Sequence, residues 1–136
     1  MMAHTGKVGI RLDRDFVVTL EHSIQFRGGH APPMLSTPSL ILELEITARD
    51  AISPYHPPED ASVGTFIELE HLAATPVGAR VQCTAKVIHI DRSVITFAIE
   101  ASDGQERIAK GIHKRRIVSI ARFSAKLNGK AGKTTT

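Results

Sequence analysis

The sequence predicts an α+β fold in which an antiparallel sheet wraps around one long central helix. The first observation is a single helical pattern of apolar residues over 39–52. The second is a series of alternating apolar and polar residues, which is typical of strands with one covered face. These strands are expected at 62–73, 79–90, 93–102 and 106–121. Because a lone apolar helix must be covered, the long strands favour a sheet curved around it.

A short strand and an irregular connection precede the helix. Phe16-Val17-Val18-Thr19 has the β-branched and aromatic content of a first strand. The connection at 21–35 contains Phe26, two glycines and two prolines, a content that disfavours an internal element. We therefore expect this connection to lie over a pocket.

The helix has defined start and stop signals. Thr37 is a favoured N-cap residue, Pro38 suits the first turn and Pro54 ends the helix. The apolar stripe consists of Leu40, Ile41, Leu44, Ala48, Ala51 and Ile52. Its spacing predicts one broad buried side.

Several helix residues lie outside this stripe. Glu43 and Asp50 are expected on the opposite side. Leu42 and Ile46 also lie off the stripe, which indicates that the helix is covered on more than one side. Glu45 lies at the edge, so it is either an exposed glutamate or a carboxylate in a functional site. Burial alone would raise its pKa, whereas a neighbouring cation would lower it.

The strand at 62–73 brings a histidine to a protected face. Its alternation places one set of residues on one side, namely Thr65, Ile67, Leu69 and His71. The other side has Phe66, Glu68 and Glu70. A histidine on such a face suits acid–base chemistry, because small shifts bring its pKa near neutral pH. A structural hydrogen-bonding role for His71 stays equally open.

Turn residues separate the strands. Thr75-Pro76-Val77-Gly78 follows the first long strand. Asp91-Arg92 and Asp103-Gly104 occupy hairpin positions, and Asp-Gly is a strong signal for a two-residue turn. Consecutive strands are therefore predicted to be antiparallel neighbours.

Length and composition indicate one soluble domain, at 1–127, with a mobile basic tail at 128–136. The chain has 136 residues, of which 42% are hydrophobic and 23% charged, as in ordinary globular proteins. It has no apolar run of membrane-spanning length, and residues 1–7 lack the apolar block of a secretory signal. We expect a cytoplasmic protein that does not bind membranes. Cys83 is the single cysteine, which excludes an intrachain disulfide and a paired-cysteine metal site.

The positive charge gathers near the C-terminus. The net charge is only +3, but Lys114, Arg115 and Arg116 are adjacent, and further lysines follow. Such a cluster could attract an anionic ligand or nucleic acid. No aromatic residues interleave with the tail to stack on bases, so we expect no nucleic-acid partner.

Three segments carry a family likeness. The first contains Thr37 and Glu45, and the second runs from Gly64-Thr65 to His71-Leu72-Ala73-Ala74-Thr75-Pro76. The third joins Gly111-Ile112-His113-Lys114-Arg115 to Ala121-Arg122-Phe123-Ser124-Ala125-Lys126. In order and spacing, residues 8–127 resemble the fluoroacetyl-CoA thioesterase-like acyl-CoA thioesterases, which have the hotdog fold. The resemblance implies hydrolysis of an acyl-CoA thioester.

The resemblance also implies site residues. It places the family's catalytic threonine, glutamate and histidine on Thr37, Glu45 and His71. It places an active-site glycine on Gly64 and a ligand-side arginine on Arg115. His113, in a mixed polar strand, is interpreted as structural. Neither a metal nor a cofactor is expected, because CoA is part of the substrate.

The connection before the helix departs from the family pattern. It is shorter than in the fluoroacetyl-CoA enzyme, where this region supplies aromatic residues near the acyl group. Here Phe26 is the candidate contact to substrate. The resemblance therefore implies a small or short-chain acyl-CoA more strongly than a fluorinated one.

The expected chemistry sets a geometric condition. Glu45 would attack the thioester or activate water, His71 would move protons, and Thr37 would orient one of them. On one regular helix, Thr37 and Glu45 are separated by about 12 Å. Either the helix begins after Thr37 or a second subunit completes the site. We expect a homodimer with sites at its interface.

Other functions stay open at this stage. The chain could be a non-catalytic acyl-CoA-binding or regulatory protein of the same fold. A hotdog hydratase would present an Asp/His pair from a differently arranged segment, and that motif is not found. Nucleic-acid binding would depend on the basic tail.

Overall fold

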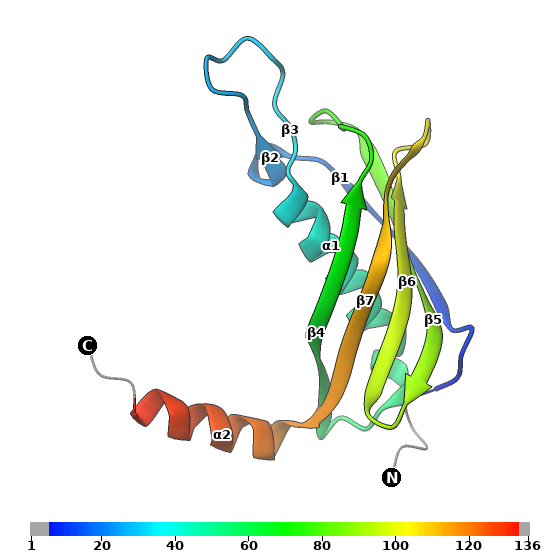
Figure 1. Cartoon of the computed structure of the whole chain (residues 1–136), viewed down its shortest axis with the longest axis vertical. Coiled ribbons are helices and arrows are strands. Elements are labelled where there is room, and N and C mark those ends of the chain that lie inside the picture. Colours follow the sequence, from blue (N-terminus) through cyan, green and yellow to red (C-terminus); the bar gives the residue numbers. More distant parts are fainter. Residues whose placement is uncertain (1–5, 134–136) are drawn as a thin grey trace.

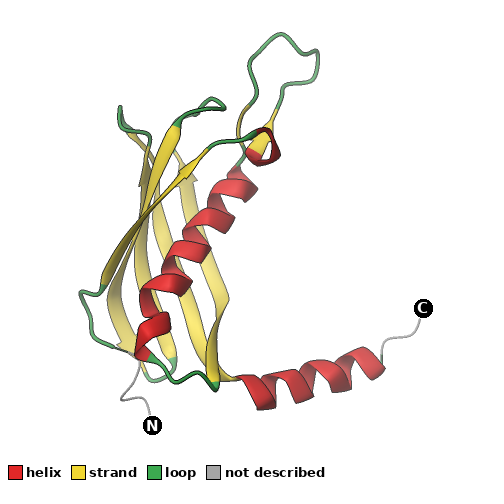
Figure 2. Cartoon of the chain, turned by 180° about the vertical axis from the view of Figure 1, so that it is seen from behind, coloured by secondary structure: helices red, strands yellow, loops and turns green. Residues whose placement is uncertain are grey.

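An antiparallel sheet of five strands curves around the long helix α1 (Thr37–Ile52) in the computed structural model, which describes residues 6–133 (Figures 1 and 2). The strand order is β1-β5-β6-β7-β4. The strand bounds are β1 Arg11–Val17, β4 Asp60–His71, β5 Arg80–Asp91, β6 Val94–Ser102 and β7 Arg107–Ser119. The predicted α+β architecture is therefore confirmed.

The core lies between α1 and the concave face of the sheet. From the helix, Leu40, Leu44, Ala48 and Ile52 have no exposed surface. They lie against a layer of buried strand residues, which includes Val81, Ala85, Ile95, Phe97 and Ile99. Burying each large aliphatic side chain stabilises the fold by roughly 1.5–3 kcal/mol, so the helix is held chiefly by this face.

The tight turns follow the predicted chemistry. Gly78 and Gly104 have φ of 96° and 88°, values that glycine adopts without strain. Arg92 has φ of 57° in the turn between β5 and β6, and it is the non-glycine residue with positive φ among residues 6–133. Asp91-Arg92 and Asp103-Gly104 therefore reverse the chain as expected.

The first strand is longer than predicted. It begins at Arg11 rather than at Phe16 and pairs with β5 along its whole length. Its inward positions include Arg14, whose guanidinium contacts Glu43 on α1. A cation at an inward position breaks the apolar alternation, and for this reason the pattern did not reveal the strand.

The prediction that Glu43 lies on the polar side of the helix is wrong. Glu43 is only 8% exposed. Its carboxylate accepts from Arg14 Nη1 at 2.6 Å and lies 3.4 Å from His22 Nε2. Burial of the carboxylate is possible because a guanidinium and an imidazole compensate for its lost hydration.

The predicted cap of α1 shifts by one residue. The N-cap is Ser36, whose side chain accepts from the Ser39 backbone N–H at 3.2 Å, and Thr37 is the first helical residue. Ser36 thus has the capping role that the sequence predicted for Thr37. As a consequence, the Thr37 hydroxyl is free to contact another element.

The connection between β1 and α1 contains short regular elements. It contains a 3-10 turn at Leu20–His22 and a two-stranded ribbon formed by β2 (Ser23–Ile24) and β3 (Met34–Leu35). The intervening loop extends beyond the N-terminal end of α1 (Figure 1). The ribbon lies beside the turn after β4, since Leu35 N–H donates to the Thr75 carbonyl at 2.8 Å.

A β-bulge changes which residues of β4 face the helix. Gly64 pairs with Arg115 of β7, and Phe66 pairs with the preceding residue, Lys114, so Thr65 is an extra residue. Such a bulge changes the alternation of sides. Before it, Gly64 faces α1; after it, His71 does. The strict alternation predicted from Thr65 onward holds only beyond the bulge, and Thr65 itself is exposed.

A second helix, α2 (Ile120–Gly132), projects from the end of β7 (Figures 1 and 2). The expectation of a strand up to residue 121 is therefore wrong by two residues, and residues 128–132 are helical. Ser119 caps this helix by accepting from the Arg122 N–H at 3.3 Å. No residue of α2 is buried, so the helix contributes no residue to the buried core. Residues 134–136 of the expected tail lie outside the described residues.

The described part of the chain contains no helix long and apolar enough to cross a membrane.

Gly111 gives a stability prediction. In the middle of β7, a Cβ at this position would overlap the Glu68 carbonyl oxygen of the neighbouring strand β4. Because that oxygen belongs to the backbone of a paired strand, Gly111→Ala should lower the free energy of unfolding by about 3 kcal/mol or more. Urea unfolding followed by circular dichroism measures the change.

Gly129→Ala is the matched control. No atom lies within 4 Å of a Cβ built on Gly129, in α2. Alanine is the better helix former, so this variant should be neutral or more stable by up to about 1 kcal/mol. Equal stability of Gly111→Ala and the unaltered protein would contradict the predicted overlap.

Candidate active site

Thr37 and His71 form the first half of the candidate site. Thr37 begins α1 and His71 is the last residue of β4. The Thr37 hydroxyl lies 2.8 Å from His71 Nδ1, which is a hydrogen-bond distance. The sequence-predicted threonine and histidine are therefore in contact within one chain.

The other nitrogen of His71, Nε2, is buried, and no described residue meets hydrogen-bond geometry with it. The Ala73 backbone lies close enough to the ring to oppose the effect of burial on its pKa. The ring borders a hollow of about 440 Å³, whose lining includes Ile24, Met34, Leu35 and Ala73. Burial lowers the pKa of His71 from its ordinary value of 6.5, so the imidazole is neutral at pH 7. A neutral imidazole beside this hollow can exchange a proton with a group that reaches the ring.

Glu45 and Gly64 form the second half of the candidate site. A Cβ built on Gly64 would lie 2.7 Å from Glu45 Oε2. The missing side chain of Gly64 thus makes room for the carboxylate. Both residues line a smaller hollow of about 240 Å³, together with Phe66, Ile67 and His113.

Arg115 lies behind this carboxylate. Its Nη1 is 3.5 Å from Glu45 Oε2, and its side chain is only 7% exposed. Nε donates to the Ser62 hydroxyl at 2.8 Å, and Nη2 donates to the Ser62 carbonyl at 2.9 Å. Its donors are thus directed at internal groups, and the contact of Arg115 with a ligand stays a prediction.

The two halves of the site are separate within one chain. Thr37 and Glu45 are eight residues apart in the same helix. This spacing corresponds to about 12 Å along the axis. The two hollows share no lining residue in the described part of the chain. A single chain therefore presents the Thr37–His71 pair and the Glu45 carboxylate at different places along α1.

Phe26 lies away from both halves. It is 62% exposed, in the loop between β2 and β3. Within residues 6–133, the residues that line the two hollows do not include it. Its contact with substrate stays a prediction.

Two further residues belong to the Glu45 group: Ser62, which was not predicted, and His113, which was interpreted as structural from the sequence. Ser62 holds the Arg115 guanidinium, and His113 Nε2 lies 3.2 Å from Arg115 Nη1. The sequence did contain a signal, because His113 and Arg115 are separated by one residue on a strand and share a face. Ser62 had no such signal, since its pairing depends on the β4–β7 register.

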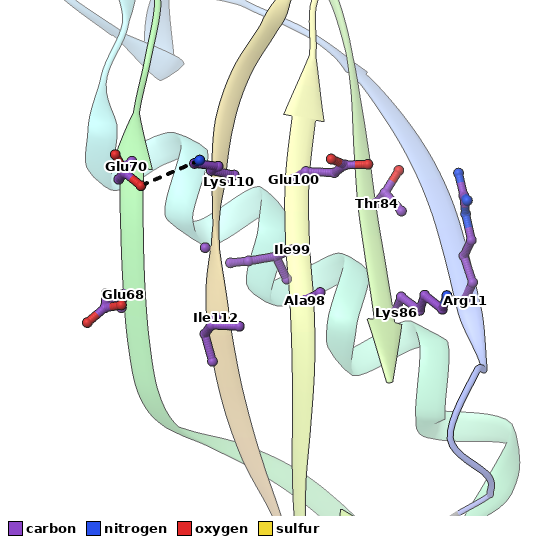
Figure 3. Close-up of a pocket in the computed structure, with 11 residues that line it drawn as sticks. Arg11, Glu68, Glu70, Thr84, Lys86, Ala98, Ile99, Glu100, Lys110 and Ile112 are labelled. Carbon is purple, nitrogen blue, oxygen red and sulfur yellow. Dashed lines mark ion pairs between the residues drawn. The ribbon is translucent and has the colours of Figure 1, made fainter. Parts of the chain in front are cut away.

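Another hollow, of about 440 Å³, lies on the face of the sheet that points away from α1 (Figure 3). Its floor includes Ala98 and Ile112, and charged side chains surround it. Glu70 and Lys110 approach each other at 4.0 Å across it. None of Thr37, Glu45 and His71 lines it. This open surface is therefore distinct from the candidate site.

A metal centre is not indicated by the side chains of the described residues. They contain no group of three or more histidine, cysteine, aspartate or glutamate side chains arranged to hold a metal ion. Cys83 is buried in the core, and burial raises its pKa to about 12, so it is not a thiolate at neutral pH.

The sequence of this chain matches a known protein family. The fluoroacetyl-CoA-specific thioesterase family matches residues 18–121. A fluoroacetyl-CoA thioesterase from Streptantibioticus cattleyicolor is 29% identical over 130 residues, which cover 91% of this chain and 94% of the relative.

Solved structures agree with the fold. The structure of the fluoroacetyl-CoA thioesterase FlK superposes with a TM-score of 0.85 at 29% identity, covering 96% of this chain and 98% of the other. A hot-dog-like protein from Thermanaerovibrio acidaminovorans superposes with a TM-score of 0.82 at 19% identity, covering 90% and 91% of the two chains. The sheet around α1 is therefore a hotdog fold.

The lowered pKa of His71 predicts a dependence of stability on pH. The folded ring has a pKa below 6.5, so between that value and 6.5 the unfolded chain binds more protons. The free energy of unfolding should therefore fall as the pH drops through this window. Urea unfolding at about pH 7.5 and pH 5.5 tests this, and the loss should be smaller in His71→Gln. An equal loss in both proteins would contradict the prediction.

Proposed function

Because this chain belongs to the fluoroacetyl-CoA-specific thioesterase family, we infer that it is a thioester hydrolase that converts an acyl-CoA and water into a free acid and CoA. The observation that carries this proposal is the hydrogen bond of 2.8 Å between Thr37 and His71. It joins two residues that are far apart in the sequence and that the family resemblance assigned to catalysis. The third assigned residue, Glu45, lies beside Gly64.

The proposed roles follow from the chemistry of each group. Glu45 acts on the thioester carbonyl, by direct attack or by removing a proton from the attacking water. His71 starts as a neutral imidazole, so it first takes up a proton released from the attacking water and then returns it to the CoA sulfur as that group leaves; the Thr37 hydroxyl orients the ring. Backbone N–H groups near Gly64 stabilise the developing oxyanion. CoA is the leaving group, so no separate cofactor takes part.

A small or short-chain acyl group fits the proposed site best. The hollow beside Glu45 has only about 240 Å³, and it is bounded by Phe66, Ile67 and His113. Phe26, the predicted contact to substrate, is 62% exposed in the loop between β2 and β3. These features support selection by size, without a dedicated site for fluorine. We place this activity in the cytoplasm, where acyl-CoA substrates occur.

We propose that the working form is a homodimer whose sites lie at the interface. β4 is an edge strand of twelve residues, and its outer edge can pair with another strand. A second copy joined there would bring its own α1 close to the first. The Glu45 carboxylate of one chain could then approach the Thr37–His71 pair of the other.

Release of CoA thiol tests the activity. The protein should hydrolyse acetyl- or other short-chain acyl-CoAs faster than long-chain ones. Glu45→Gln and His71→Ala should each lower kcat by about a hundredfold or more, because each removes a group that acts in the transition state. A panel of acetyl-, fluoroacetyl-, aryl- and long-chain acyl-CoAs measures both preference and loss.

Glu68→Gln is the matched control for Glu45→Gln. Glu68 is an exposed carboxylate on the opposite face of the sheet, so its loss should leave kcat unchanged. Saturable binding of acyl-CoA without any CoA release would favour the non-catalytic binding protein instead. Hydrolysis that survives both site substitutions would mean that the assigned residues are wrong.

Mixing two inactive variants tests the shared site. In a dimer of Glu45→Gln with His71→Ala, one site would receive an intact Glu45 from one chain and an intact His71 from the other. Random mixing should then restore about a quarter of the unaltered activity, since half of the dimers are mixed and each has one intact site. No recovery in a mixture shown by mass measurement to contain mixed dimers would contradict the shared site.

A further inference from the structure

His113 is buried behind Glu45 and contacts the same arginine. It is 1% exposed, on β7, and its Nε2 lies 3.2 Å from Arg115 Nη1. The same Nη1 is 3.5 Å from Glu45 Oε2. We propose that His113 is a positioning residue, which accepts a hydrogen bond from Arg115 and thereby keeps the guanidinium from closing onto the Glu45 carboxylate. This inference rests on the proposed function of Glu45.

The contacts of the ring determine its tautomer. His113 Nδ1 lies 2.9 Å from the Phe66 carbonyl oxygen, which can only accept, so Nδ1 carries the proton. Arg115 Nη1 can only donate, so Nε2 must present its lone pair. The two requirements select the same neutral imidazole. A protonated ring would direct an N–H at the guanidinium and place two cations in contact.

The surroundings favour this neutral state. The ring stacks on Phe97, with centroids 6.0 Å apart and an interplanar angle of 26°. Burial lowers the pKa of His113; the Phe66 carbonyl opposes this shift, and the positive charge of Arg115 adds to it. The charged groups that act on Arg115 from α1 are Glu45, Arg49 and Asp50. His113 is therefore an uncharged acceptor at neutral pH.

The distribution of the arginine donors explains the effect on Glu45. Ser62 occupies Nε and one N–H of Nη2, and Nη1 has two N–H groups, so the bond of one of them to His113 holds Nη1 at 3.2 Å from the ring while the carboxylate stays 3.5 Å away. A closed pair of this kind is shorter: Arg14 and Glu43 lie 2.6 Å apart in the same chain. The longer separation leaves Glu45, which is 35% exposed, turned toward the hollow. Without the His113 acceptor, Nη1 would bind the carboxylate directly and withdraw it.

Two substitutions at one position separate positioning from packing. His113→Leu removes the acceptor but keeps an apolar side chain in the core. It should lower kcat about tenfold and shift the acid limb of the pH–rate profile to lower pH, because a closed pair with Arg115 stabilises the ionised carboxylate. His113→Gln keeps a neutral acceptor and should recover kcat to within about threefold, with the acid limb unshifted. His89→Leu, at an exposed histidine of β5, should change neither quantity.

The possible results have separate meanings. A fall in kcat without a shift of the acid limb, or equal losses in His113→Leu and His113→Gln, would indicate lost packing and overturn the positioning role. Nitrogen-15 NMR of the unaltered protein provides a readout that does not depend on activity. It should show a protonated Nδ1 and an unprotonated Nε2 at His113, and the opposite tautomer would overturn the inference. If the unaltered protein hydrolyses no acyl-CoA in the panel, the proposed function fails, while the NMR result still decides the arginine contact.

Discussion

The bulge at Thr65 determines which residues of β4 reach α1, and both halves of the candidate site depend on it. In a regular strand, Gly64 and His71 would face opposite sides, because His71 comes seven positions after Gly64, an odd step along an alternating strand. One additional residue at Thr65 changes this alternation, so Gly64 makes room for Glu45 and His71 contacts Thr37. Because of this one bulge in the pairing with β7, β4 contacts α1 at two places, at Glu45 through Gly64 and at Thr37 through His71.

The straightness of α1 then sets the relation between those positions. Thr37 and Glu45 are fixed at either end of two helical turns, and the core packing of the helix prevents them from approaching each other. Local movement of side chains cannot span about 12 Å of helix axis. The hypothesis of a shared site follows from this constraint, and not from any observed partner. It requires that a second copy pair with the edge strand in a register that brings its Glu45 to the Thr37–His71 pair of the first.

The sequence was most informative where patterning is local and least informative where a polar group is buried by a distant partner. Alternation and turn residues predicted the four long strands, and the helix boundaries followed from Pro38 and Pro54. Hydrophobic spacing predicts only the apolar side of the helix, so it placed Glu43 on the exposed side. Its partner, Arg14, lies on β1, far from Glu43 in the sequence. Likewise, the contact between Ser62 and Arg115 depends on the register of two strands, which no short pattern specifies. The family resemblance supplied the site residues, but it did not place Arg115 in the interior.

Two carboxylate–guanidinium pairs on α1 illustrate why one glutamate is structural and another is a candidate for catalysis. Glu43 lies 2.6 Å from Arg14 and its side chain is 11% exposed, so its lost hydration is replaced by protein groups. Glu45 stays 3.5 Å from Arg115, is 35% exposed and borders a hollow. Arg115, beside Glu45, donates from Nε and Nη2 to Ser62. It can therefore stabilise a nearby negative charge without forming a closed ion pair with the Glu45 carboxylate. The same pair of residue types thus anchors the helix on one side and leaves a partly exposed carboxylate beside a hollow on the other.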